Sequence, residues 1–281
     1  RGATTRGPHV SSRTAPLKIL SLLIALLISH HWPDARRWRR YGWLIAGARR
    51  LTPSDPHWLA GAFLVAIALV VGAAAAAAAE AVAGLFGLLV VGTAALLYTL
   101  GPDHLDRDIA RAVDADDGPR RQTARERLLI RPDASGNEAA AAALHAALAR
   151  WFGVVLWFAV LGPAGCLAYR AVREGHRAEA FQPPERAWLG HLLGWLNWPV
   201  VALMTAAIAL MTDFDRVKAT FEQREDRWQM PAALLDDLAR TLCDPGAGIA
   251  EGLADGRRLA WRVLSIWLAV LSLLLLAGLF S

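Results

Sequence analysis

Charged residues and long uncharged runs alternate along this chain instead of mixing. Five uncharged runs approach or exceed the roughly 20 apolar residues that a helix needs to cross a hydrocarbon core of about 30 Å. They occupy residues 58–79, 81–100, 151–169, 188–212 and 263–280. None alternates apolar and polar residues as the strands of a membrane barrel do. The pattern therefore predicts an all-α, polytopic integral membrane protein with about five spanning helices.

Two features refine the N-terminal part of this picture. The run at residues 17–32 is shorter, contains Lys18, and is followed by no small-residue cleavage site. It therefore predicts an N-terminal anchor or half-span instead of a cleaved signal peptide. Residues 1–16 are expected to be a leader or tag remnant. Glu80 alone separates two long runs, which predicts a helical hairpin that turns at this residue.

The runs divide the rest of the chain into five expected segments. These are an N-terminal anchor, Arg-rich segment and helical hairpin (17–100), a cytoplasmic helical segment (101–150), a kinked membrane helix pair (151–212), a second cytoplasmic helical segment (213–262) and a C-terminal membrane helix (263–281). In both cytoplasmic segments apolar residues recur at helical spacing between Pro- and Gly-containing turns. Short surface helices are therefore expected there.

Composition and charge agree with a membrane protein. Of the 281 residues, 55% are hydrophobic and 20% are charged, and the mean hydropathy is +0.32. The formal net charge of +5 would by itself permit nucleic-acid binding. The arginines, however, flank the predicted spans, where membrane orientation and anionic headgroups account for them. We therefore expect a lipid bilayer, and no nucleic acid, as a partner.

The positive-inside rule places three Arg-rich segments in the cytoplasm, residues 34–57, 101–150 and 213–262. Arg49 and His104 are then cytoplasmic and Glu80 is external. Residues 170–187 carry four arginines and would lie outside if both flanking runs cross fully. Either this loop is an exception to the rule, or one of the runs crosses incompletely.

The sequence holds none of the common catalytic or cofactor-binding motifs. It lacks a Walker A sequence, a His-Glu-x-x-His zinc motif and a Cys-x-x-Cys pair. Three aspartates near His104 could in principle hold a divalent cation, but acidic residues at a helix start are explained more simply by the helix dipole. We therefore expect no cofactor, no metal and no catalytic residue, and an enzymatic role is the less favoured one.

A helix-breaking motif lies inside the run at residues 151–169. Its Gly-Pro-Ala-Gly sequence contains Pro163, which has no N–H, so the carbonyl of Ala159 loses its helical partner and the helix is expected to kink. In lipid that carbonyl needs another donor. Asn197, which precedes a Trp-Pro pair in the next run, can supply two amide N–H groups.

Two interpretations of this pair stay open. In the first, Pro163 and Asn197 face each other and form a membrane-embedded binding site with Tyr169 and Arg170 at its rim, as paired broken helices do in transporters. In the second, small residues allow close helix packing and Asn197 merely ties two helices together.

At this motif the chain resembles a known family. Gly162, Pro163 and Gly165, followed by Tyr169 and Arg170, match the Gly-Pro-x-Gly-x-x-x-Tyr-Arg stretch of the AmpE family. That family comprises inner-membrane proteins associated with regulation of β-lactamase and encoded with the cell-wall amidase AmpD. The same stretch is similar to one in the cobinamide-phosphate synthases CobD and CbiB.

Weaker similarities follow in the same order along most of residues 17–281. Arg107 and Asp108 lie in a Leu-Asp-Arg-Asp stretch, Asn197 lies in a Leu-Asn-Trp-Pro stretch, and a C-terminal span follows. One feature departs from the synthases, which have an Asn-Trp-x-Pro-Ala-Arg pattern. Here the proline follows the tryptophan directly and the arginine is missing.

The resemblance implies a multi-pass regulatory protein of the bacterial inner (cytoplasmic) membrane, linked to cell-wall state and β-lactamase regulation. A small-molecule or cell-wall-derived ligand and a protein partner are implied with it. Two alternatives stay open: a membrane enzyme of the cobinamide-phosphate synthase type that forms an amide bond, and a transport or assembly partner. The residues implied for ligand binding are Gly162, Pro163, Gly165, Tyr169, Arg170, Asn197, Arg107 and Asp108.

Overall fold

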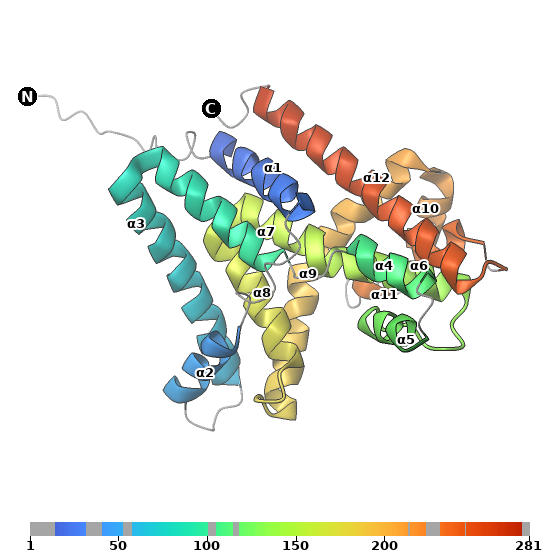
Figure 1. Cartoon of the computed structure of the whole chain (residues 1–281), viewed down its shortest axis with the longest axis horizontal. Coiled ribbons are helices and arrows are strands. Elements are labelled where there is room, and N and C mark those ends of the chain that lie inside the picture. The colour runs from blue at the N-terminus through green and yellow to red at the C-terminus, as the bar shows by residue number, and fades with distance from the viewer. Residues whose placement is uncertain are drawn as a thin grey trace, which may run out of the picture. The chain divides into compact units, whose positions relative to one another are not determined.

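The computed structural model describes residues 15–31, 41–52, 58–100, 105–114, 118–212, 214–222, 231–244 and 246–276. Within these ranges every regular element is a helix, which confirms the predicted all-α class (Figure 1). The helices are α1 (Ala15–His31), α2 (Gly42–Leu51), α3 (Trp58–Thr99), α4 (Leu105–Asp114), α5 (Gly118–Arg127), α6 (Gly136–Ala147), the π-helical turn Leu148–Phe152, α7 (Gly153–Leu161), α8 (Pro163–Arg177), α9 (Pro183–Met211), α10 (Phe214–Glu222), α11 (Pro231–Leu242) and α12 (Ile249–Leu276).

Three helical stretches in the described residues are long and apolar enough to cross a membrane. They are Trp58–Thr99, Gly136–Leu161 and Pro183–Met211. The chain is therefore a membrane protein, as its sequence predicts. The predicted count of about five spans is not confirmed. The runs 58–79 and 81–100 both lie in the single stretch of α3, and the described part of the run 263–280 lies in α12, outside the three stretches.

The described chain divides into two compact units. The first comprises residues 1–100, 154–175 and 268–281, and the second comprises residues 101–153 and 176–267. The first unit therefore contains α1, α2, α3 and most of α7 and α8. The second contains α4 to α6, the π-helical turn and α9 to α11, with most of α12.

Helix α3 reverses direction within the first unit. Gly84 has φ 56° and ψ −135°, a conformation that only glycine adopts without strain. Figure 1 shows the two arms of α3 meeting at this bend. The arms come so close that a Cβ atom on Gly87 would lie 2.1 Å from the carbonyl oxygen of Ala79. The predicted hairpin is thus present, but it turns at Gly84. Glu80 is a good helix former and continues the first arm.

A second reversal follows the same rule. Gly162, with φ 64°, ends α7, and Pro163 begins α8. A Cβ atom on Gly165 would lie 2.2 Å from the carbonyl oxygen of Trp157, eight residues earlier. The spacing is the same as between Gly87 and Ala79. The sequence predicts one kinked helix here, whereas the structure has two helices. A left-handed glycine is a favoured helix end and proline a favoured helix start, so the motif terminates one helix and begins another.

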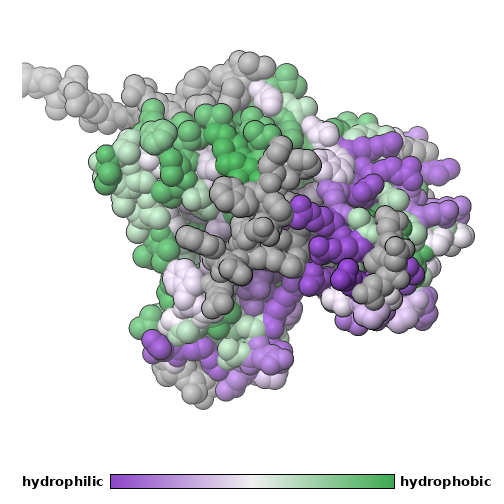
Figure 2. All heavy atoms as spheres, viewed as in Figure 1, coloured by the Kyte–Doolittle hydropathy of each residue, from purple (hydrophilic) through white to green (hydrophobic). Residues whose placement is uncertain are grey.

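The surface of α3 is largely apolar and open. Only 17% of its most apolar stretch is buried within the structure, and Val82 and Phe86 are among its exposed side chains. Figure 2 shows hydrophobic residues gathered over this helix. The buried side of the first unit is built from small and aliphatic residues such as Leu22, Leu64 and Leu96. The first unit thus has apolar residues both on the surface of α3 and in its buried core. A lipid environment favours such an arrangement.

The second unit mixes close helix packing with polar surface. A capping box between Ser135 and Glu138 starts α6. Close approach of α6 and α12 requires small residues, since a Cβ atom on Gly252 would lie 2.0 Å from the carbonyl oxygen of Gly136. The short helices α4, α5, α10 and α11 account for the surface helices that the sequence predicts in the two polar segments.

Candidate functional site

The predicted ligand-binding residues fall into both units. Gly162, Pro163, Gly165, Tyr169 and Arg170 lie together at the α7–α8 turn and along α8, in the first unit. Asn197 on α9 and the pair Arg107 and Asp108 on α4 belong to the second unit. The predicted pairing of Pro163 with Asn197 therefore stays a prediction.

The carbonyl that Pro163 leaves without a helical partner is satisfied by Lys18. The Nζ atom of Lys18, on α1, donates to the carbonyl oxygens of Ala159 at 3.1 Å and Val160 at 3.3 Å. The sequence names Asn197 as a possible donor, a pairing that stays a prediction; the donor that the structure shows is a lysine from the first helix. A lysine suits this role because its long apolar stem can pass along α1 while its ammonium offers three N–H donors.

Arg170 is the centre of a buried polar cluster in the first unit. Arg170 is 8% exposed, and its Nη2 atom lies 3.0 Å from Oε1 of Glu174, one turn further along α8. The Cζ atom of Arg170 lies 5.6 Å from the ring centroid of Tyr41, within cation–π range. Among the described residues its Nε atom finds no hydrogen-bond partner. The guanidinium therefore keeps one unused N–H in a buried setting.

Three aromatic residues complete this group, which we call the Arg170 cluster (Tyr41, Trp43, Tyr98, Arg170 and Glu174). The Tyr41 hydroxyl donates to the carbonyl oxygen of Tyr98 at 2.9 Å, and the indole N–H of Trp43 donates to the Tyr98 hydroxyl at 3.3 Å. Burial raises the pKa of Tyr41 above its usual range, against an opposite effect of Arg170. Tyr41 is therefore a neutral phenol at physiological pH.

An apolar cavity of about 530 Å³ adjoins the Arg170 cluster. Its wall combines Trp43 from α2, Ala68 and Ala94 from the two arms of α3, and Pro163 and Leu167 from α8. Tyr98 belongs both to this wall and to the cluster. Two residues of the family-like motif therefore have different surroundings, because Pro163 lines the cavity whereas Arg170, on the same helix, is not among its lining residues.

Asp108 forms a buried ion pair in the second unit. It is 1% exposed, and its Oδ2 atom accepts a hydrogen bond from Nη1 of Arg150 at 2.7 Å. Arg127 approaches its other oxygen to 3.8 Å. Arg107 lies on the exposed side of α4. Of the two predicted residues on α4, Asp108 thus joins this helix to the π-helical turn that contains Arg150.

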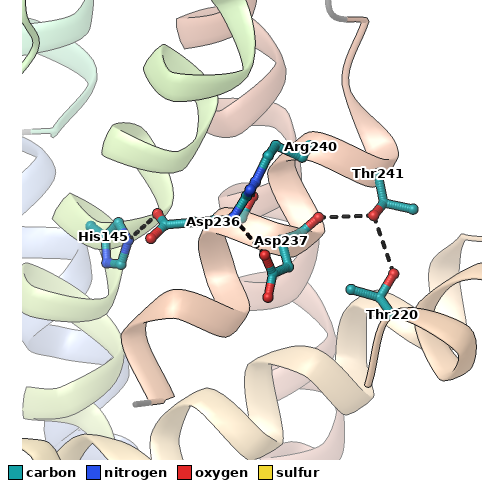
Figure 3. Close-up of polar contacts among 6 residues, drawn as sticks. All are labelled: His145, Thr220, Asp236, Asp237, Arg240 and Thr241. Carbon is teal, nitrogen blue, oxygen red and sulfur yellow. Dashed lines mark hydrogen bonds and ion pairs between the residues drawn. The ribbon is translucent and has the colours of Figure 1, made fainter. Parts of the chain in front are cut away.

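A further polar chain links α6, α11 and α10. His145 lies 2.7 Å from Oδ1 of Asp236, Arg240 pairs with Asp237 at 2.6 Å, and Thr241 bonds both Asp237 and Thr220 (Figure 3). Sequence reasoning missed this connection. A histidine in an alanine-rich helix and an aspartate 91 residues later carry no pattern that links them.

Within the described residues, no group of three or more His, Cys, Asp and Glu side chains is arranged to hold a metal ion. Cys166 and Cys243 are both buried and free. Burial raises the pKa of the Cys243 thiol to about 11, so the thiol is protonated at physiological pH.

No family model matches the chain, and neither a curated protein nor a solved structure matches it.

Proposed function

We propose that this chain is a multi-pass regulatory protein of the bacterial inner membrane, of the AmpE kind, that relays cell-wall state to the control of β-lactamase. The resemblance of residues 162–170 to that family supports the proposal. One structural observation carries it furthest: a single membrane-length helix contributes to both units.

This relay helix (Gly136–Leu161) is apolar and long enough to span a membrane. Two polar contacts tie it to α11 and α4: His145 bonds Asp236, and Arg150, near the middle of the relay helix, bonds Asp108. Its last residues, 154–161, belong to the first unit and lead into the Gly162 reversal. A shift of the relay helix in the membrane would therefore pull on α4 and α11 through hydrogen bonds that tolerate little displacement.

The π-helical turn Leu148–Phe152 lies where the relay helix passes from one unit to the next. Such turns occur frequently at functional sites. Here the turn is held by aromatic contacts with α12: Trp151 lies 5.4 Å from Trp261, and Phe152 lies 5.0 Å from Trp267. The turn thus has defined side-chain contacts with α12 at the place where a conformational relay would act.

The proposal is tested by β-lactamase induction in a host whose own gene for this protein is deleted. We expect the deletion to change induction by a β-lactam and the wild-type chain to restore it. Asp108→Asn should fail to restore it, because the buried side chain at position 108 loses its charge and the charge-assisted hydrogen bond from Arg150 is weakened. Arg131→Gln is the matched control, since Arg131 is 68% exposed and its pair with Glu138 lies at the surface. Membrane fractionation must show equal insertion of all variants. An induction profile that the deletion leaves unchanged would refute the proposal.

A further inference from the structure

A basic pocket lies in the second unit, where the end of α9 meets α10, α11 and α12. Its volume is about 330 Å³, within the range of roughly 300–1,000 Å³ typical of small-molecule sites. Three arginines line it, Arg216 on α10 and Arg258 and Arg262 on α12. Asp255 is the one acidic residue in its wall, and the other lining residues are uncharged. The pocket therefore has an excess of positive charge.

The two arginines of α12 differ in what they bind. Arg258 donates to the carboxylate of Asp255, three residues earlier on the same helix. Arg262 lies one turn further along the same face and forms no hydrogen bond or ion pair with another described residue. Its guanidinium therefore has N–H donors and a charge available to a ligand. Phosphate oxygens match both, because they accept charge-assisted hydrogen bonds from the planar fork of an arginine.

The pocket lies at the end of a membrane-length helix. Its lining residue Thr212 directly follows the stretch Pro183–Met211, which is long and apolar enough to span a membrane. Arg262 is the last charged residue before the apolar run 263–280, which the sequence predicts to be a membrane helix. Trp261 precedes it and is 42% exposed, and tryptophan is enriched at the level of lipid headgroups. These positions indicate that the arginines lie beside headgroups and not in the hydrocarbon core.

We propose that this pocket binds the phosphate of an anionic phospholipid, with Arg262 as its principal donor. Basic pockets beside membrane helices attract such headgroups, because the attraction between the charges is strong close to the membrane surface. Helix α9 also offers apolar surface to the acyl chains, for example Leu210 in its last turn, which is 76% exposed. A soluble phosphate compound cannot use that surface. The site goes beyond the proposed regulatory function and does not depend on it.

The choice of headgroup is tested with the full-length protein purified in detergent micelles and analysed by native mass spectrometry. The protein is titrated with phosphatidylglycerol and, separately, with phosphatidylcholine that carries the same acyl chains. We expect the first phosphatidylglycerol to bind about tenfold more tightly, because the arginines repel the cationic group of phosphatidylcholine. Inorganic phosphate at the same concentration as the lipid should not displace it. Equal affinity for the two lipids, or displacement by inorganic phosphate, overturns the proposal.

The role of Arg262 is tested by Arg262→Gln in the same titration. We expect about tenfold weaker binding of phosphatidylglycerol, because a charge-assisted hydrogen bond is lost, and partial recovery in Arg262→Lys. Arg240→Gln is the matched control, since Arg240 is 65% exposed in the same unit and lies outside the pocket. Wild-type affinity in Arg262→Gln, or an equal loss in both glutamine variants, overturns the proposal. Should Arg262→Gln fail to fold, Arg216→Gln removes another arginine of the pocket and is compared with the same control.

Discussion

Lys18 connects α1 to the α7–α8 reversal. Its ammonium satisfies the carbonyls of Ala159 and Val160, which face the break before Pro163. We expect Lys18→Met to lower the free energy of unfolding by about 1 kcal/mol, since hydrogen bonds between membrane helices are worth about 0.6 kcal/mol each on average. Thermal unfolding in micelles measures this.

The matched control is Lys218→Met, because Lys218 is 57% exposed and its pair with Glu222 is loose, at 3.8 Å. Lys18→Arg should retain most of the stability, since a guanidinium can reach the same carbonyls. If the Lys18→Met variant unfolds at the same temperature as the wild type, the two carbonyls have found another donor.

Cys243 gives a prediction about pH at the same scale. Its thiol is 6% exposed and its pKa is raised to about 11, first by burial and then by Asp255. The thiolate is the reactive form, so in a Cys166→Ser background alkylation by iodoacetamide should be slow at pH 8 and should accelerate with each pH unit up to about 11. The folded chain holds this proton more tightly than the unfolded chain does. The stability from this group is therefore complete below pH 9 and is lost as the pH rises from 9 to about 11. Rapid, pH-independent alkylation of the folded protein would contradict the assignment.

At the scale of elements, the two helix reversals of the first unit share one construction. Each has a glycine with positive φ, Gly84 or Gly162, and a second glycine three residues later. Gly87 and Gly165 allow two backbones to touch, because a Cβ atom there would lie 2.1 Å and 2.2 Å, respectively, from a carbonyl oxygen. The repetition indicates that close backbone approach, and not a flexible loop, closes both hairpins.

We therefore expect Gly87→Ala and Gly165→Ala each to destabilise the protein by about 1–3 kcal/mol, the usual cost of overpacking. Gly47→Ala and Gly194→Ala are the controls. Both positions are helical with open space around the added methyl group, so alanine should be neutral or stabilising by about 0.5–1 kcal/mol. Reversible unfolding in mixed micelles distinguishes the two pairs. Similar values for all four variants would mean that the reversals do not depend on backbone contact.

The sequence anticipates these elements only in part. An uncharged run on each side of Glu80 predicts a hairpin, and the hairpin is present. Its turn is displaced to Gly84 because alanine and glutamate prefer the helix, and the chain reverses at the first glycine after Glu80. Likewise Pro163 predicts a distortion, but the preceding Gly162 turns a kink into a complete helix break.

At the scale of the whole molecule, the predicted orientation in the membrane follows from the arginine distribution. Arg49 and His104 are expected in the cytoplasm and Glu80 outside. His104 lies outside the described residues, and Glu80 is exposed close to the α3 reversal. In a background without Cys166 and Cys243, a membrane-impermeant maleimide added from outside should label Glu80→Cys and leave Arg49→Cys and His104→Cys unlabelled. Labelling of His104→Cys together with failure at position 80 would invert the orientation.

The sequence by itself determined that the chain is helical and membrane-embedded. In lipid, a segment presents apolar side chains on its surface and must form its backbone hydrogen bonds within itself. Both properties can therefore be recognised from long uncharged runs. Only the tertiary structure decided which groups meet. The contacts of Lys18 with Ala159, His145 with Asp236 and Arg150 with Asp108 join residues separated by 141, 91 and 42 positions. The cavity is likewise lined by residues of α2, of both arms of α3 and of α8. Such contacts depend on helix packing, which no local pattern of apolar and polar residues encodes.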